Sequence, residues 1–322
     1  MRRREFITLL GGTTATWPLT VRAQQSSKIY RLGYLAPAPI PHLIRALVST
    51  LRELGYVEGK NLKIEYRYGG SETLDSLAAE LVELHPDAIV TVATPPALAA
   101  KRATKTIPVV MATAGDPVRL GVVSSYARPG GNITGVTLYS TELTAKRLEL
   151  LNEAVPGLRR IAFLANGKNI YNKFLWEETE PAARALGLEP QLFNMQEPGD
   201  LAGTFVEMER KGANALVVLS DALFNSLRRQ IIALATEHHL PAMYEAREFV
   251  EDGGLISYGP DIAEMTRRSA TFVDKVLKGI NPADLPIEQP TRFELVINKK
   301  SARALGLTLS PTLLARADEV IE

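Results

Sequence analysis

The sequence predicts an α/β protein made of two doubly wound parallel-sheet lobes joined by a hinge. Short apolar and β-branched runs alternate with amphipathic helical patterns along the chain, which is typical of parallel sheets covered by helices. The alternation completes one series, restarts near residue 141 and completes a second. Runs such as "AIVTV" (88–92) and "ALVVL" (215–219) are apolar throughout, as expected of strands buried on both faces.

The first series contains five predicted strands, over residues 28–35, 62–68, 88–92, 109–113 and 131–138. The helices between them are expected over residues 42–54, 73–84 and 96–103. In the first of these helices, apolar residues fall on one face, and Gly55 follows as the expected C-terminal cap.

The second series contains six predicted strands, over residues 161–165, 190–195, 215–219, 241–244, 254–258 and 293–297. Its helices are expected over residues 141–154, 173–186, 200–211, 223–237 and 261–278, with one more at the C-terminus. Because crossovers between parallel strands are right-handed, each series forms its own sheet with helices on both faces.

We assign residues 28–138 and about 247–283 to the N-terminal lobe, and residues 139–246 and about 284–322 to the C-terminal lobe. Ligands in such sheets bind at the carboxyl ends of strands. The cleft between the lobes is therefore the expected binding site.

The amino-terminal residues predict an export signal over 1–23 that is cleaved near Ala23; the stretch is "MRRREFITLLGGTTATWPLTVRAQQ". Three arginines precede a weakly apolar stretch that is shorter than the roughly 20 residues a bilayer span needs. The stretch "RREFI" resembles the twin-arginine motif; the alternative is an ordinary secretory signal with an arginine-rich head.

The net charge and the absence of cysteine limit the kinds of partner and site that the protein can have. Cleavage would remove four of 37 basic and one of 36 acidic residues, leaving a net charge near −2 and no basic stripe for a nucleic acid. The chain has no cysteine, which excludes disulfides, cysteine-based metal sites and a lipid anchor on cysteine. We expect a monomer that is free in the periplasm and not membrane-anchored.

Three segments carry a family resemblance: "LRELGYVEGKNLKIEYRYGGS" (51–71), the block "GDPV…ARPGGNITG" (115–135) and "FELVINKKSARALGL" (293–307). They resemble the ABC transporter substrate-binding proteins of the tryptophan/tyrosine-transporter type. The resemblance implies a type I periplasmic binding protein, with two lobes joined by three crossing segments. Such a protein closes on a small-molecule solute and docks on an inner-membrane ABC permease.

In the first lobe, two strand ends supply candidate ligand contacts. Thr94 and Pro95 start the helix after the third strand, where a hydroxyl and backbone N–H groups would seat a ligand carboxylate. The alternative is a helix cap with proline in the first turn. Asp116 and Pro117 follow the fourth strand; Asp116 would hold an ammonium group, or cap the next helix and tie the loop. The proline-rich turn 36–41 is expected to form an apolar wall.

The first crossing segment, over residues 137–141, adds Thr137 and Tyr139, of which Tyr139 would line the cleft or serve the hinge. In the second lobe the strand ends supply further candidates, Asn166, Asp221, Ala222, Tyr244, Glu245 and Tyr258. Asp221 would contact the ligand or cap the helix that follows it. Tyr258 would stack on a ligand ring or pack in the core.

We expect no enzyme, no cofactor and no metal site, because no activated nucleophile, phosphate loop or metal-ligand set emerges. His238 and His239 lack a third ligand at metal spacing. Gly130 and Gly131 do not stand between a strand and a helix, as the glycines of a dinucleotide-binding motif would. The expected function is hinge closure on an amino acid-like or carboxylated solute. Two alternatives stay open: a binding subunit for a sensor kinase or chemoreceptor, and a two-lobed glycosyltransferase-like enzyme.

Overall fold

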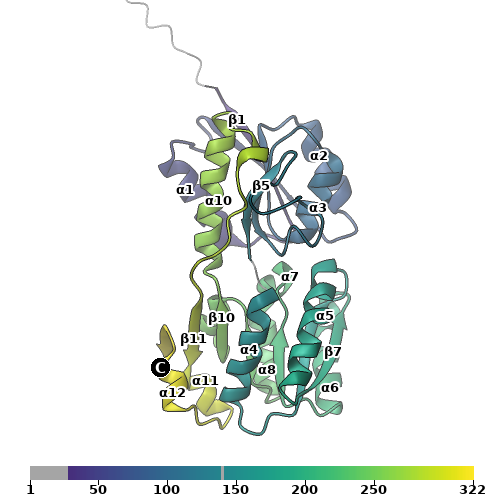
Figure 1. Ribbon diagram of the computed structural model, residues 1–322, viewed down its shortest axis with the longest axis vertical. Coiled ribbons are helices and arrows are strands. Elements are labelled where there is room, and N and C mark those ends of the chain that lie inside the picture. The colour runs from purple at the N-terminus through teal and green to yellow at the C-terminus, as the bar shows by residue number, and fades with distance from the viewer. Residues whose placement is uncertain (1–27, 139–140) are drawn as a thin grey trace, which may run out of the picture.

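The computed structural model describes residues 28–138 and 141–322, which form two lobes with chain segments passing between them (Figure 1). Each lobe has a central β-sheet with helices on both faces. The expected fold class is confirmed. The expected export signal and Tyr139 lie outside the described residues. Within the described ranges, none of the helices has the length and hydrophobicity of a membrane span.

The first lobe is built on a five-stranded parallel sheet with the order β2-β1-β3-β4-β5. Its strands are β1 (Tyr30–Ala36), β2 (Leu62–Tyr68), β3 (Ala88–Thr91), β4 (Val109–Ala114) and β5 (Ile133–Thr137). Its helices are α1 (Pro41–Glu53), α2 (Leu74–Glu83), α3 (Thr94–Ala103) and α10 (Ile262–Leu277). In β3, Val90 packs with the core under α1 and α10, and Ile89 with the core under α2 and α3. Both faces of β3 are thus buried, which explains its unbroken apolar run.

The second lobe is built on a seven-stranded sheet with the order β12-β11-β10-β9-β8-β6-β7. Its strands are β6 (Arg160–Asn166), β7 (Glu189–Met195), β8 (Ala215–Val218), β9 (Ala242–Tyr244), β10 (Ile256–Gly259), β11 (Glu294–Asn298) and β12 (Glu319–Ile321). Helices α4 (Thr141–Ala154), α5 (Ile170–Ala185), α11 (Lys299–Ala304) and α12 (Pro311–Ala315) pack with one face. Helices α6 (Leu201–Arg210), α7 (Ala222–Ser226), α8 (Arg228–Glu237) and α9 (Arg247–Glu251) pack with the other.

Two strands, β11 and β12, depart from the wholly parallel sheet that the sequence predicts, because β12 is parallel to β11. β11 pairs antiparallel with β10, whereas β9 and β10 are parallel. The reason is the path of the chain: β10 runs toward the first lobe, and β11 returns from it. A strand that re-enters the sheet from the cleft side must run in the opposite direction.

The expected boundaries of the lobes were wrong at the second and third crossings. The sequence predicts that residues from about 247 to 283 lie in the first lobe, but α9 and β10 belong to the second, because β10 pairs with β9 and β11. The chain crosses after Gly259, and α10 then packs against α1 (Figure 1). It stays with the first lobe until Glu288, whose N–H donates to the carbonyl of Gly135 in β5 at 2.9 Å.

Candidate ligand-binding cleft

Two adjoining cavities lie between the lobes, lined by the ends of strands from both sheets. The inner cavity measures about 620 Å³ and the outer one about 1030 Å³, counting space that is open to solvent. They share four lining residues: Ala93, Asn169, Asp221 and Ala222. This position, beyond the carboxyl ends of the strands, is the ligand site of open α/β sheets.

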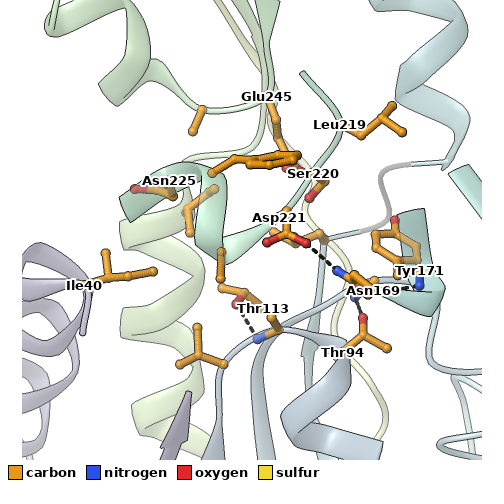
Figure 2. A pocket seen from close by; sticks show the side chains of 18 of the residues that line it. Ile40, Thr94, Thr113, Asn169, Tyr171, Leu219, Ser220, Asp221, Asn225 and Glu245 are labelled. Atoms are coloured by element: carbon orange, nitrogen blue, oxygen red, sulfur yellow. Dashed lines mark hydrogen bonds between the residues drawn. The ribbon is translucent and has the colours of Figure 1, made fainter. Parts of the chain in front are cut away.

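The turn after β3 places Thr94 at the inner cavity and Pro95 at the outer one. Ala93 has a φ of 72° and a ψ of 170°, a strained conformation for a residue with a side chain. Its N–H donates to Thr113 Oγ1 at 3.2 Å, and Thr94 Oγ1 accepts the N–H of Gly115 at 2.9 Å (Figure 2). These two bonds hold the ends of β3 and β4 together at the cleft.

The start of α3 offers fewer donors than an ordinary helix N-terminus. Pro95 and Pro96 have no N–H, so the first turn presents only the N–H groups of Thr94 and Ala97. The hydroxyl of Thr94, whose oxygen is an acceptor for Gly115, can still donate its own hydrogen. A ligand carboxylate at this place would therefore depend on Thr94 more than on the helix end.

Asp116 and Pro117 do not line either cavity. Asp116 Oδ1 accepts the N–H groups of Val118 and Arg119, at 3.1 and 3.0 Å, and the hydroxyl of Tyr126 at 2.8 Å. The carboxylate therefore ties its own loop, as the second expected role had it, but the expected helix cap is wrong, because the next described element is β5.

Asp221 lines both cavities, but its carboxylate is occupied by the protein. Oδ2 accepts the side-chain amide of Asn169 at 2.8 Å (Figure 2). Oδ2 also accepts the side-chain amide of Asn166 at 3.1 Å, and Oδ1 accepts the N–H of Leu223 at 2.7 Å. Burial raises the pKa of the Asp221 carboxyl, while these hydrogen bonds act in the opposite direction. Asp221 thus caps α7 and binds two loops of the second lobe to each other.

Glu245 and Asn225 line the inner cavity, and each carries a buried acceptor atom. The residues are 7% and 6% exposed, and within the described part of the chain Glu245 Oε1 and Asn225 Oδ1 have no hydrogen-bond partner. The nearest cation to Glu245 Oε1 is Arg147, whose Nη2 lies 3.8 Å away, beyond hydrogen-bond distance. A buried acceptor without a donor is unfavourable by about 1–3 kcal/mol. These oxygens are therefore suited to N–H donors of a bound molecule.

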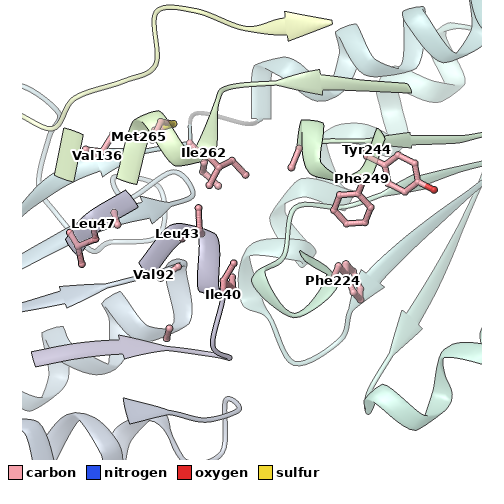
Figure 3. Packing of buried hydrophobic residues seen from close by; sticks show 14 of the residues in the cluster. Ile40, Leu43, Leu47, Val92, Val136, Phe224, Tyr244, Phe249, Ile262 and Met265 are labelled. Atoms are coloured by element: carbon pink, nitrogen blue, oxygen red, sulfur yellow. The ribbon is translucent and has the colours of Figure 1, made fainter. Parts of the chain in front are cut away.

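Apolar side chains from both lobes face the inner cavity (Figure 3). The first lobe contributes Ile40, Leu43, Val92 and Ile262, and the second contributes Phe224 and Phe249. All six belong to one cluster of buried hydrophobic residues that continues from lobe to lobe. The cleft can therefore hold an apolar group between its walls, with the acceptors of Glu245 and Asn225 at one side.

Four other predicted residues have different surroundings. Ala222 lines both cavities. Thr137 is fully buried and its hydroxyl donates to two backbone carbonyls at the end of β4. Tyr244 stacks on Phe249, with ring centroids 4.5 Å apart, behind the cavity wall. Tyr258 is half-buried and does not line the cleft.

Several lining residues were not predicted from the sequence. Tyr171 stands at the start of α5, Phe224 and Asn225 lie in α7, and Phe249 lies in α9. Each lies within six residues of a strand end or predicted polar contact. Extending the strand-end rule into the first turn of the next helix would have included most of them.

Contacts between polar or charged side chains also join the lobes around the cleft. They are Lys168–Glu72, with a distance of 2.8 Å, His42–Glu248, with a distance of 3.3 Å, and Arg119–Glu178. The hydroxyl of Ser71 further donates to the carbonyl of Lys168 at 3.1 Å. The lobes therefore touch through polar groups at the rim as well as through apolar groups inside.

Metal ligation is not indicated in residues 28–138 and 141–322, where no three His, Cys, Asp or Glu side chains are grouped to hold an ion. His238 contacts Glu209, with 2.7 Å between Nδ1 and Oε2. The chemistry that the cleft offers is recognition: buried acceptors for a donor group, apolar walls, and a hydroxyl on the opposite lobe.

Comparison with known proteins gives the family. Residues 42–321 match the model of the ABC transporter substrate binding protein family. The chain belongs to this family. The resemblance found in the sequence is thereby confirmed.

Among its relatives is a tyrosine-binding protein from Clostridioides difficile, 26% identical over 265 residues, which cover 82% of this chain and 76% of the relative. A conserved domain protein from Vibrio cholerae has a TM-score of 0.84 at 28% identity, covering 91% of this chain and 100% of that one. An ABC domain from Streptococcus pneumoniae in complex with L-Trp has a TM-score of 0.82 at 29% identity, covering 90% and 100%.

Proposed function

We propose that this substrate-binding protein captures an amino acid with an apolar, aromatic-sized side chain in the inner cavity. It then delivers that amino acid to an ABC permease without chemical change. The observation that carries the proposal is Glu245, which lines a largely apolar cavity between the lobes and whose buried Oε1 has no hydrogen-bond partner among the described residues. The relatives that bind tyrosine or hold L-Trp support the same class of ligand.

The proposed pose uses both lobes. The ligand ammonium donates to Glu245 Oε1 and Asn225 Oδ1 in the second lobe. The ligand carboxylate accepts from Thr94 of the first lobe, and the side chain lies among the apolar residues that continue between the lobes. A charge-assisted bond in a site of low polarity is stronger than a neutral one.

Hinge closure then couples capture to delivery. The open form binds the amino acid to one lobe, and the other lobe completes its contacts as the cleft shuts. Micromolar binding corresponds to about −8 kcal/mol, which a few hydrogen bonds and one apolar wall can supply. The permease recognises the closed form.

The proposed location of the protein in the cell rests on its amino-terminal residues. Residues 1–23 have the three-part pattern of an export signal, with the "RREFI" stretch of the twin-arginine route. The mature protein then works as a free monomer in the periplasm, next to the permease that it serves.

A thermal-shift screen of the mature chain, residues 24–322, tests the ligand class. We expect L-tryptophan, L-tyrosine or L-phenylalanine to raise the melting temperature, because a ligand that binds only the folded state stabilises it. Tryptamine and indole-3-propionate, which lack one charged group each, should give smaller shifts. A response to sugars alone, or turnover of any bound compound, would contradict the proposal.

A further inference from the structure

Arg147 is a buried cation that contacts the chain where it leaves the second lobe. It lies in α4 and is 3% exposed, although arginine is rarely buried without a role for its charge. Its Nε donates to the carbonyl of Tyr258 at 2.6 Å. Tyr258 and Gly259 end β10, after which the chain crosses to the first lobe and forms α10.

The same guanidinium lies behind the cleft. Arg147 Nη2 is 3.8 Å from Glu245 Oε1, so the two charges attract without forming a hydrogen bond. Burial lowers the pKa of Arg147, while the Glu245 carboxylate acts in the opposite direction. Glu245 Oε1 therefore has a nearby countercharge but no hydrogen-bond donor among the described residues.

Gly259 brings the crossing segment against both partners. A β-carbon at Gly259 would lie 2.1 Å from the carbonyl oxygen of Glu245 and 3.2 Å from Arg147 Nη2. The end of β10, the loop after β9 and the guanidinium are thus in direct contact. Because these groups are closely packed, a shift of Glu245 or Arg147 is expected to move the segment after Gly259, where the chain crosses between the lobes for the second time.

We propose that Arg147 is a positioning residue that holds Glu245 toward the cleft and couples its occupancy to the second crossing. The inference rests on the proposed function, since it requires that Glu245 receives a donor from the ligand. When an ammonium group binds Glu245, it joins Arg147 as a second cation beside one carboxylate. The Arg147 contact to Tyr258 transmits that change to the segment on which the lobes turn.

A double-mutant cycle in the mature chain tests this coupling. The probes are L-tryptophan and L-tyrosine, with dissociation constants measured by titration calorimetry for the wild type, Arg147→Met, Glu245→Gln and the double variant. We expect each single change to weaken binding by roughly tenfold or more. The double variant should bind about as well as Glu245→Gln alone, because the two residues act through one contact.

Arg31→Met is the matched control, because Arg31 donates to the backbone carbonyl of Leu84 in the first lobe and lines neither cavity. We expect it to lower stability and leave the dissociation constants unchanged. If Arg147→Met behaves in the same way, its role is structural and the inference is wrong. Losses that multiply in the double variant would also overturn it.

A second variant and a hydrogen-exchange measurement separate a coupling role of Arg147 from a structural one. Should Arg147→Met not fold, Arg147→Lys retains the charge but not the forked contact, and it should weaken binding while the protein stays folded. In wild type, L-tryptophan should slow hydrogen exchange at the amides of residues 256–259; equal slowing in Glu245→Gln would contradict the coupling. Failure of wild type to bind either amino acid would instead contradict the proposed function.

Discussion

The ring of Tyr171 in the second lobe lies directly against the backbone of Gly115 in the first. A β-carbon at Gly115 would be 2.3 Å from Tyr171 Cζ and 2.4 Å from Cε2, closer than any real side chain allows. Gly115 is also the residue whose N–H donates to Thr94 at the inner cavity. The absence of a side chain at position 115 therefore lets the lobes meet beside the ligand site.

Gly115→Ala should hinder closure and so weaken ligand binding. The added methyl group meets the Tyr171 ring only when the lobes are together, so the open form is not affected. We expect at least a tenfold rise in the dissociation constant for L-tryptophan by calorimetry, with a small change in melting temperature. Gly203→Ala is the control, because a β-carbon there meets nothing within 4 Å. Wild-type affinity in Gly115→Ala would show that closure does not need this contact.

Lys168→Ala should weaken binding slightly and in a salt-dependent way. Lys168 pairs with Glu72 across the lobes and with Glu197 within its own lobe, but all these groups are at the rim. Exposed pairs contribute little, so we expect less than about a fivefold loss of affinity. The difference from wild type should shrink between about 10 mM and 1 M salt. Lys278→Ala, which breaks a pair within α10, should have no effect on affinity; a large, salt-independent loss in Lys168→Ala would contradict this account.

The interlobe contact of Glu248 with His42 predicts a dependence of stability on pH. Burial raises the pKa of the Glu248 carboxyl, but His42 and the nearby Arg228 bring it below its usual value of 4.5. Stability from this group is therefore present above pH 4.5 and is lost as the pH falls through the lower folded-state value. Urea unfolding of wild type and Glu248→Gln should converge on acidification. Parallel curves down to about pH 3 would show that the carboxylate contributes nothing.

Asp221→Ala should lower stability more than its place in the cleft would suggest. The change removes the cap of α7 and leaves the amides of Asn166 and Asn169 without their acceptor. We expect a loss of about 1–3 kcal/mol in the free energy of unfolding, measured with urea. A variant of unchanged stability that fails to bind amino acids would return Asp221 to the role of an ammonium partner.

The sheets could be predicted because their strands carry a local signal. The buried runs of β3 and β8 are apolar on both faces, and the helices between strands show one apolar face each. The assignment of β10 to a lobe could not be predicted in the same way. Its sequence "ISYG" fits either sheet, and only its pairing with β9 and β11 decides the matter.

The roles of single carboxylates in the candidate site also could not be predicted from the sequence near them alone. Asp116, Asp221 and Glu245 all follow strands, and their position at strand ends predicts a ligand contact for each. Asp116 is satisfied by N–H groups two and three residues on, which is a local pattern that the "DPVR" stretch could have indicated. Glu245 differs because no described donor reaches its Oε1, and that depends on distant elements packing around it.

The most direct test of the account is the affinity of wild type and Glu245→Gln for L-tryptophan and indole-3-propionate. Calorimetry at one pH and salt concentration compares the four combinations. We expect wild type to bind tryptophan roughly 10- to 100-fold more tightly than its amine-free analogue, and Glu245→Gln to lose most of that preference. Equal preference in the two proteins would mean that the ligand ammonium does not lie at Glu245, and would contradict the central claim.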